Sequence, residues 1–432
     1  MRYTTYVRQF SPWGIPAIYA VVALVAGMTL PRLEVAMLPD LVLPISVSSA
    51  TAIYSSIAAG MISLTGIVFS LTFVMVQFSA TAYSPRLVLL IARGPVMSHA
   101  LGIFTANFLY AIAALVGIDR NGSGTVPAIS AYIVIGLLLA SVSMFIVLIQ
   151  RIGLLQVNQM LVFTGDQGRQ VINNLYPPIH SAPAVYPEED LSKLPCTQTL
   201  VHEGTPNSVQ HVYVKSMVNL AKSAGAVIEV AVAVGDTVSD SMPLLQVYGA
   251  REPIPETALQ ECIELGGERT FDQDPKYAIR LLVDIAIRAL SPAINDPTTA
   301  VQALDQIEDL LLRMGHRRLE IGSFRDDEGK VRLVVTFPTW EDLLRLAFDE
   351  ICFYGGTSVQ VMRRMNAVVA DLMRALPDER DVALIYWQKR IKAVITRSFV
   401  SDEEREEAMM EDRQGLGIPR QDPLARGSAA SV

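Results

Sequence analysis

The sequence predicts an α-helical integral membrane domain of four transmembrane helices, followed by an α+β cytoplasmic domain with a small β-barrel-like module and a helical region. Two observations support this fold class. The chain of 432 residues is 51% hydrophobic, which is high for a soluble protein of this length, and the apolar excess lies almost wholly in the first third. The rest alternates between helical and strand-like spacing of apolar residues, as a soluble domain does.

Four segments are long and apolar enough to cross a bilayer, whose hydrocarbon core needs about 20 helical residues. Their expected ranges are 13–30, 50–83, 99–118 and 127–152. Pro31 follows the first segment directly. We set aside a cleaved signal peptide, because no small-residue cleavage site follows this segment and Trp13 is typical of an interfacial anchor. The predicted spans hold no acidic or basic residue placed to couple ions, which argues against a secondary transporter.

The arginines predict the orientation of these spans. Two precede the first span, two lie between the second and third, and two follow the fourth: Arg2, Arg8, Arg86, Arg93, Arg151 and Arg169. The other two connections hold one arginine each. The positive-inside rule therefore predicts a multi-pass protein of the bacterial inner membrane with both termini in the cytoplasm. Its three cysteines, Cys196, Cys262 and Cys352, are interpreted as buried thiols in a reducing compartment.

The second span is unusual because it carries no charge over a length of about 50 Å as a helix, more than the hydrocarbon core needs. Polar residues recur along one face of it, at Ser56, Ser63, Ser70 and Gln77, with Gly60 on the same stripe. Thr65, Thr72 and Ser79 form a second line on the opposite face. Such stripes can pack against other helices, or one of them can line a water-filled path between subunits.

Changes in composition along the chain predict five segments. They are a transmembrane domain (1–153), a helix and proline-rich linker (154–205), a small β-rich module (206–252), a mainly helical cytoplasmic domain (253–400) and a disordered tail (401–432). In the β-rich module we expect a helix stopped at Gly225 and a turn at Gly235 and Asp236. The module resembles biotinyl or lipoyl barrels in its turn but has no carrier lysine, so a structural or assembly role is expected.

Six helices are expected in the mainly helical domain, at 257–265, 275–290, 297–314, 341–354, 357–376 and 381–399. One hairpin, turning at Asp327 to Gly329, lies between the third and the fourth. The stretch SPAINDPTTA (291–300) separates two of the helices: Pro292 ends one, and Asp296 caps the next with Pro297 at its first position. Asp274 and Pro275 repeat the device one helix earlier.

Capping leaves several polar residues near this motif unexplained. Arg280, Asp284 and Arg288 are spaced four apart along the preceding helix, as solvated surface charges would also be. The alternative is a subunit or domain contact in which Arg269 and Arg288 bond the corner formed by Asn295 and Asp296. The candidate docking or structural motif comprises Arg269, Asp284, Arg288, Ser291, Asn295 and Asp296.

Three stretches together carry a family resemblance: ERTFDQDP from Glu268, LVDIAIRALSPAINDPTTA up to Ala300, and SPRL at Ser84 to Leu87. They resemble the signature of a bacterial family of predicted membrane proteins, the domain of unknown function 2254 family. The resemblance covers nearly the whole chain and implies the fold. It implies little about function, because the family's role is unassigned.

Several functional classes are disfavoured by the sequence. A net charge of −8 without a clustered basic face argues against a nucleic-acid partner. The five histidines do not pair at metal-binding spacing, and there is no glycine-rich phosphate loop or nucleophile elbow. We therefore expect no enzyme, no cofactor and no metal site.

The favoured function is a channel or other pore in contact with membrane lipid, with a cytoplasmic domain for assembly or regulation. Four spans are too few to enclose a path alone, so a homo-oligomer is expected. The alternative is a membrane-anchored scaffold or sensor whose cytoplasmic domain binds a partner or small ligand. The sequence leaves the ion or ligand open.

Overall fold

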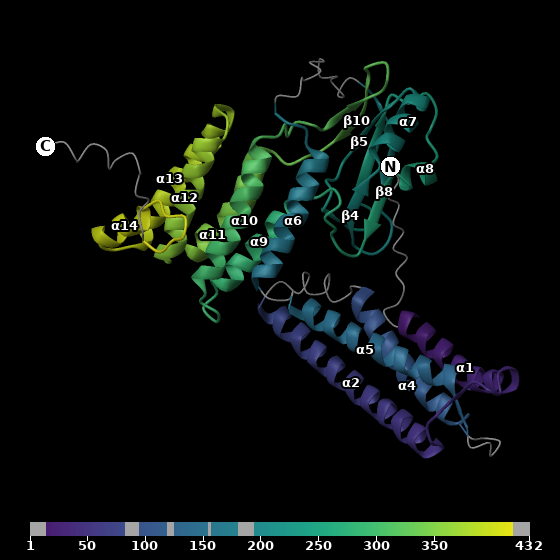
Figure 1. Cartoon of the computed structure of the whole chain (residues 1–432). Coiled ribbons are helices and arrows are strands. Elements are labelled where there is room, and N and C mark those ends of the chain that lie inside the picture. The colour runs from purple at the N-terminus through teal and green to yellow at the C-terminus, as the bar shows by residue number, and fades with distance from the viewer. Residues whose placement is uncertain (1–13, 83–94, 119–124, 154–156, 180–193, 418–432) are drawn as a thin grey trace, which may run out of the picture. The chain divides into compact units, whose positions relative to one another are not determined.

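The computed structural model describes residues 14–82, 95–118, 125–153, 157–179 and 194–417. The chain divides into two compact units, Met1–Met160 and Leu161–Val432, which we call the membrane unit and the second unit. Figure 1 labels the helices and strands of both.

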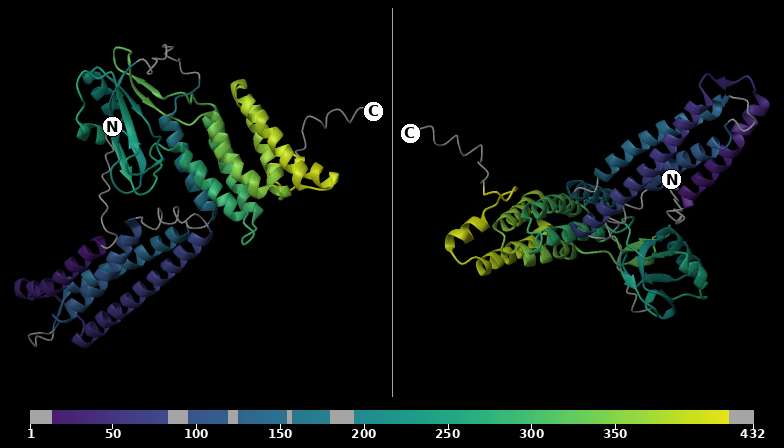
Figure 2. Two further views of the ribbon diagram at one scale, coloured as in Figure 1. Left: turned by 180° about the vertical axis from the view of Figure 1, so that it is seen from behind. Right: turned by 90° about the horizontal axis from the view of Figure 1, so that it is seen from below.

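The described part of the membrane unit contains four long helices, each apolar and long enough to cross a membrane. They are α1 (Gly14–Met37), α2 (Val47–Ala82), α4 (Pro95–Leu115) and α5 (Ala128–Gly153). Helix α4 is central, because it packs against each of the other three (Figures 1 and 2). Two short antiparallel strands, β1 (Val42–Leu43) and β2 (Val126–Pro127), join the segments that follow α1 and precede α5.

Helix α1 differs from its prediction because it continues through Pro31 for almost two further turns. A proline inside a helix removes one backbone hydrogen bond, so tertiary contacts must support the distorted turn. Gly117 supplies one such contact, since a Cβ there would lie 3.2 Å from the Cβ of Pro31. One turn earlier, Gly27 lets α1 approach α4 so closely that an added Cβ would lie 2.7 Å from the Cβ of Ala113.

The second unit begins with most of α6 (Val157–Leu175) and contains two sheets. The larger has the strand order β3-β7-β5-β10-β9 and the smaller the order β6-β4-β8. The strands are β3 (Cys196–Val201), β4 (Asn207–Val212), β5 (Val227–Val230), β6 (Thr237–Val238), β7 (Pro243–Tyr248), β8 (Ile263–Gly266), β9 (Ser323–Arg325) and β10 (Val331–Val335). All pairings are antiparallel except that of β5 with β10.

The two sheets share one apolar core with helix α7 (Val214–Ala224). Helix α7 ends at Gly225, which adopts a left-handed φ of 66°, as expected from the sequence. The predicted closed barrel is not found in the described residues: the strands form two separate open sheets. The β9–β10 hairpin, which we assigned to the helical domain, completes the larger sheet by pairing with β5, so the β-rich module does not end at residue 252.

The helical part contains α8 (Glu256–Gln260), α9 (Pro275–Ala289), α10 (Pro297–Gly315), α11 (Trp340–Gly355), α12 (Val359–Ala375) and α13 (Asp381–Ser398). The last five confirm their predicted ranges to within two residues. Helix α8 is shorter than predicted, because Ile263 onward forms strand β8 beside β4.

The tail also differs from its prediction. The chain after Ser401 forms a helix, α14 (Asp402–Met409), opened by a capping box between Ser401 and Glu404. Residues 418–432 of the predicted disordered tail lie outside the described residues.

Candidate functional sites

The predicted stripe on α2 lies on the face of the helix that its own bundle leaves uncovered. Ser56, Gly60, Ser63, Ser70 and Gln77 are all exposed, and an added Cβ at Gly60 would meet no atom within 4 Å. Packing among the described residues of the membrane unit therefore does not explain the stripe. Covering it requires water, lipid or another protein surface.

The opposite line of polar residues on α2 is only partly described. The Thr65 hydroxyl donates a hydrogen bond of 2.7 Å to the carbonyl oxygen of Met61, one turn earlier in the same helix. This bond satisfies the hydroxyl locally, so Thr65 needs no partner across a helix contact. The side chains of Thr72 and Ser79 lie outside the described part of the chain.

A buried carboxylate inside the membrane unit corrects the expectation that the spans hold no such residue. Glu34 lies in the last part of α1 and is 6% exposed. Its two oxygens accept hydrogen bonds from the backbone amides of Ile129, at 2.6 Å, and Ser130, at 3.0 Å. These amides lie in the first turn of α5, where the helix dipole favours a negative charge. Glu34 was not expected within a span, because the predicted helix ended before Pro31.

Two further polar contacts connect the helices of this unit. The amide nitrogen of Asn107 donates to the hydroxyl of Ser141, at 3.2 Å, and both side chains are fully buried. The Tyr19 hydroxyl lies 3.2 Å from Nδ1 of His99. Such bonds between membrane helices are usually packing contacts, and apolar side chains, among them Phe104 and Leu148, fill much of the interior of the bundle.

In the second unit, the Asp-Pro motifs cap helices as predicted. Asp296 accepts from the amide of Thr299, at 3.1 Å, and from its hydroxyl, at 2.6 Å. The loop before it is closed by its own backbone: the amides of Ile294 and Asn295 donate to the carbonyl oxygen of Ser291. Asn295 takes a left-handed φ of 50°, a conformation that asparagine tolerates better than most residues.

The two arginines that we considered as partners of the corner at Asn295 and Asp296 do not bond it in the described residues. Arg269 donates to Asp274, at 3.0 Å from its Nε, and lies over the ring of Tyr277. Among the described residues, neither Arg269 nor Arg288 donates a side-chain hydrogen bond to Asn295 or Asp296. The hydroxyl of Ser291 donates to the carbonyl oxygen of Arg288, at 2.7 Å.

Asp284 belongs to a different contact, because it pairs with Arg280 at 2.7 Å and Arg280 also pairs with Glu350 of α11 at 2.6 Å. Asp284 therefore helps hold α9 against α11 inside the second unit. The SPRL stretch (84–87) lies outside the described residues, so its relation to the motif is not described.

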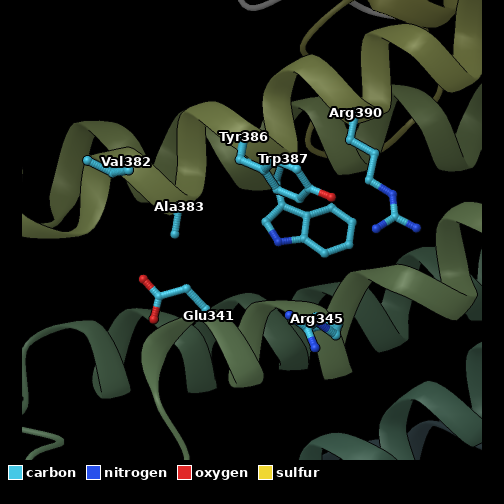
Figure 3. Close-up of a pocket in the computed structure, with 7 residues that line it drawn as sticks. All are labelled: Glu341, Arg345, Val382, Ala383, Tyr386, Trp387 and Arg390. Atoms are coloured by element: carbon cyan, nitrogen blue, oxygen red, sulfur yellow. The ribbon is translucent and has the colours of Figure 1, made fainter.

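A groove between α11 and α13 contains two neighbouring hollows in the second unit. The first, of about 230 Å³, is lined by Glu341, Arg345, Val382, Ala383, Tyr386, Trp387 and Arg390. Figure 3 shows Trp387 and Arg390 of α13 reaching towards α11, with Glu341 and Arg345 on the facing helix. The guanidinium of Arg390 lies 4.8 Å from the centre of the Trp387 ring and pairs with Asp349.

The second hollow, of about 540 Å³, shares Arg390 with the first and is bordered by Phe353 and Tyr354, which are 78% and 52% exposed. The thiol of Cys352 lines it. Burial raises the pKa of this thiol to about 12, so it is protonated and unreactive at neutral pH. The groove therefore offers aromatic and cationic surface, but its cysteine is not a nucleophile.

The described cysteines do not all match their prediction. Cys262 and Cys352 are buried, whereas Cys196 is exposed on β3, which is an edge strand of the larger sheet. In the described ranges, no group of three or more histidine, cysteine, aspartate or glutamate side chains is placed to hold a metal ion.

Comparison with known proteins identifies the family of this chain. The model of the family described as predicted membrane protein (DUF2254) matches residues 9–371. An uncharacterized protein of Mycobacterium bovis and one of Mycobacterium tuberculosis are each 26% identical to this chain, over 92% of its length and 78% of theirs. No solved structure matches the chain significantly. Since the family model spans most of the chain, the protein belongs to the DUF2254 family of predicted membrane proteins.

Proposed function

We propose that the protein is a homo-oligomeric pore of the bacterial inner membrane, in which the exposed stripe of α2 faces a water-filled path between subunits. The observation that carries the proposal is the uncovered position of Ser56, Ser63 and Ser70 within a helix that is long and apolar enough to cross a membrane. Hydrocarbon offers their hydroxyls no hydrogen-bond partner beyond a carbonyl of their own helix, whereas a second copy or water offers a further one.

The length of α2 supports the same arrangement. The helix has 36 residues, whereas about 20 are enough to cross a hydrocarbon core. At 1.5 Å per residue the remaining length is about 24 Å, and Gln77 lies near the C-terminal end of the helix. A stripe that continues past the span suits a path that opens into water at its end.

A test separates a pore-lining stripe from a packing stripe. Ser63→Leu and Ser70→Leu add apolar bulk on the stripe, and Ile62→Phe adds bulk at a 55% exposed apolar position outside it. Oligomer mass and ion flux in liposomes are measured for each variant. A pore predicts that the leucine variants keep the oligomer mass and lose most of their flux, while Ile62→Phe keeps both.

Two outcomes would contradict the pore. The first is a wild-type protein that conducts no ion under any tested gradient. The second is loss of the oligomer in both leucine variants, which would assign the stripe to packing between copies.

A membrane-anchored sensor or scaffold is the second candidate, and the groove between α11 and α13 favours it. Trp387, Tyr386 and Phe353 supply aromatic surface there, and Arg345 supplies positive charge beside Glu341, whereas Arg390 is paired with Asp349. This combination suits a small anionic aromatic ligand or an acidic apolar peptide segment. If the wild type conducts no ions, the groove becomes the leading site of function.

A further inference from the structure

The most exposed apolar side chains of the second unit gather on two neighbouring helices. Four of those that are more than half exposed in its described residues lie on α11 or α13: Phe353, Tyr354, Val382 and Tyr386, at 78%, 52%, 80% and 57%. A fifth, Val400, follows α13 directly. Exposed apolar residues scattered singly are ordinary, whereas a group of them along one surface usually marks a contact.

The two hollows of the groove show how this surface is laid out. The first lies between the beginnings of α11 and α13, and the second lies between their ends. Arg390 lines both, so the hollows follow one another along a pair of helices that run in the same direction (Figure 3). The pair is about 25 Å long. We call its exposed side, from Glu341 and Val382 to Tyr354 and Arg397, the α11–α13 face.

Charge is distributed unevenly along the α11–α13 face. At its beginning lie the exposed carboxylates of Glu341, Asp378 and Glu379, with Arg345 beside them. The later part of α13 carries exposed cations instead: Lys389, Lys392 and Arg397. The carboxylates of α11 in this later part, Asp349 and Glu350, are paired with Arg390 and Arg280. The face is therefore acidic at one end and basic at the other.

A surface with this pattern is complementary to itself when a second copy is turned end for end. Opposite charges then meet at both ends, as in interfaces whose charges fix the orientation of the partners. Helix dipoles also favour acidic residues at the beginning of a helix and basic residues at its end, so the charges alone would not identify a contact. The exposed aromatic and aliphatic side chains along the same face supply the apolar surface that a contact buries.

We propose that the α11–α13 face binds the same face of a second copy of the chain about a two-fold axis. The carboxylates at the beginning of the face in one copy meet the cations at its end in the other. The protruding Val382 side chain of each copy reaches the second hollow of its partner, which has about 540 Å³ and is bordered by Phe353. The inference rests on the proposed homo-oligomer and names the surface through which two second units associate.

Cross-linking of the full-length protein in detergent tests the contact. Cys196→Ser removes the exposed native thiol, and Val382→Cys and Thr396→Cys place two exposed thiols on α13. These positions are about 21 Å apart along the helix, too far for a short bismaleimide to join them within one copy. Between copies turned end for end they lie opposite each other, so a cross-linked dimer is expected. Lys215→Cys in place of Val382→Cys, at an exposed position of α7, should give little dimer.

Charge reversal tests the orientation in the same cysteine background. Lys392→Glu with Arg397→Glu, or Asp378→Lys with Glu379→Lys, brings like charges together at both ends and should lower the cross-linked fraction at least about fivefold. All four reversals together restore opposite charges and should recover most of it. The two charged groups lie at opposite ends of α13, so this recovery requires a second copy.

Several outcomes would overturn the proposal. One is a cross-linked fraction no higher than that of the Lys215→Cys control, which would leave the groove open to the ligand of a sensor. Another is a fraction that neither charge reversal lowers, or one that the fourfold variant does not recover. A protein that conducts ions but fails these tests keeps the pore and loses this contact. A protein that passes them but conducts no ions keeps the contact and loses the pore.

Discussion

Two aspartates with the same local role differ in their surroundings. Asp274 caps α9 and is 1% exposed, with Arg269 as its ion-pair partner. Gly235 lies against this pair with a φ of 91°, and a Cβ there would be 2.2 Å from a carboxylate oxygen of Asp274. Burial raises the pKa of Asp274, and the positive charge of Arg269 acts in the opposite direction. Asp296 caps α10 in a more open position, and among the described residues its carboxylate accepts hydrogen bonds from Thr299 alone.

The two caps should therefore respond differently to substitution. Asp296→Ala is expected to cost about 1 kcal/mol of stability and Asp296→Asn almost nothing, because asparagine also caps helices. Asp274→Ala and Asp274→Asn should both cost at least about 2 kcal/mol, since each leaves Arg269 without its carboxylate. Denaturant unfolding of the purified protein measures all four changes. If Asp296→Asn were as costly as Asp296→Ala, the charge of Asp296 would matter and a docking role would gain support.

At the scale of single residues, the features that could be predicted were those that the neighbouring residues in the sequence determine, such as helix caps. A cap bonds an amide three residues ahead, so Asp274 and Asp296 could be recognised from the residues that follow them. The partner of Arg269 could not be ranked in this way, because Asp274 and the corner at Asn295 are both polar and a local pattern does not determine which of them Arg269 reaches in the fold. Glu34 had a usable signal: Gly27, Pro31 and Glu34 continue one buried helical face at spacings of four and three.

Among the elements, helices with one apolar face were predictable and strand partners were not. Helices α9 to α13 show the apolar spacing that defines their limits. Strands of two to six residues carry little information about which strand they pair with, and β5 and β10 are far apart in sequence. Helix α14 was missed because its charged composition outweighed the capping box of Ser401 and Glu404.

Helix α14 and the residues that follow it supply partners for α12, which gives a testable consequence. Arg363 donates to the carbonyl oxygen of Glu407, Asn366 donates to that of Ala408, and Arg413 pairs with Asp371. The three residues of α12 are nearly buried, so removal of their partners is unfavourable. A chain that ends after Val400 should lose about 3 kcal/mol of stability in the second unit.

The matched control for this truncation is a chain that ends after Gly417, which keeps α14 and Arg413. Thermal unfolding of both purified chains gives the comparison. Equal stability of the two truncated chains would show that α14 contributes nothing to the fold.

For the whole molecule, the arrangement in the membrane is still a prediction. The distribution of arginines predicts both termini in the cytoplasm, and the four spans return the chain to the side on which it started. Reporter fusions at Asp119 and Val432 should therefore give a periplasmic and a cytoplasmic signal, respectively. The opposite pair of signals would invert the orientation, and two signals from the same side would be inconsistent with four spans.

The parallel pairing of β5 with β10 has a consequence for biosynthesis. Val230 pairs with Val335, so 105 residues must leave the ribosome after β5 before its second edge can be covered. At about 5–20 residues per second this interval lasts roughly 5–20 s. During that time β5 presents an apolar strand edge of the kind that promotes association between chains. The nascent protein is thus most in need of chaperone protection after its membrane segments have been synthesised and before its last three long helices have emerged.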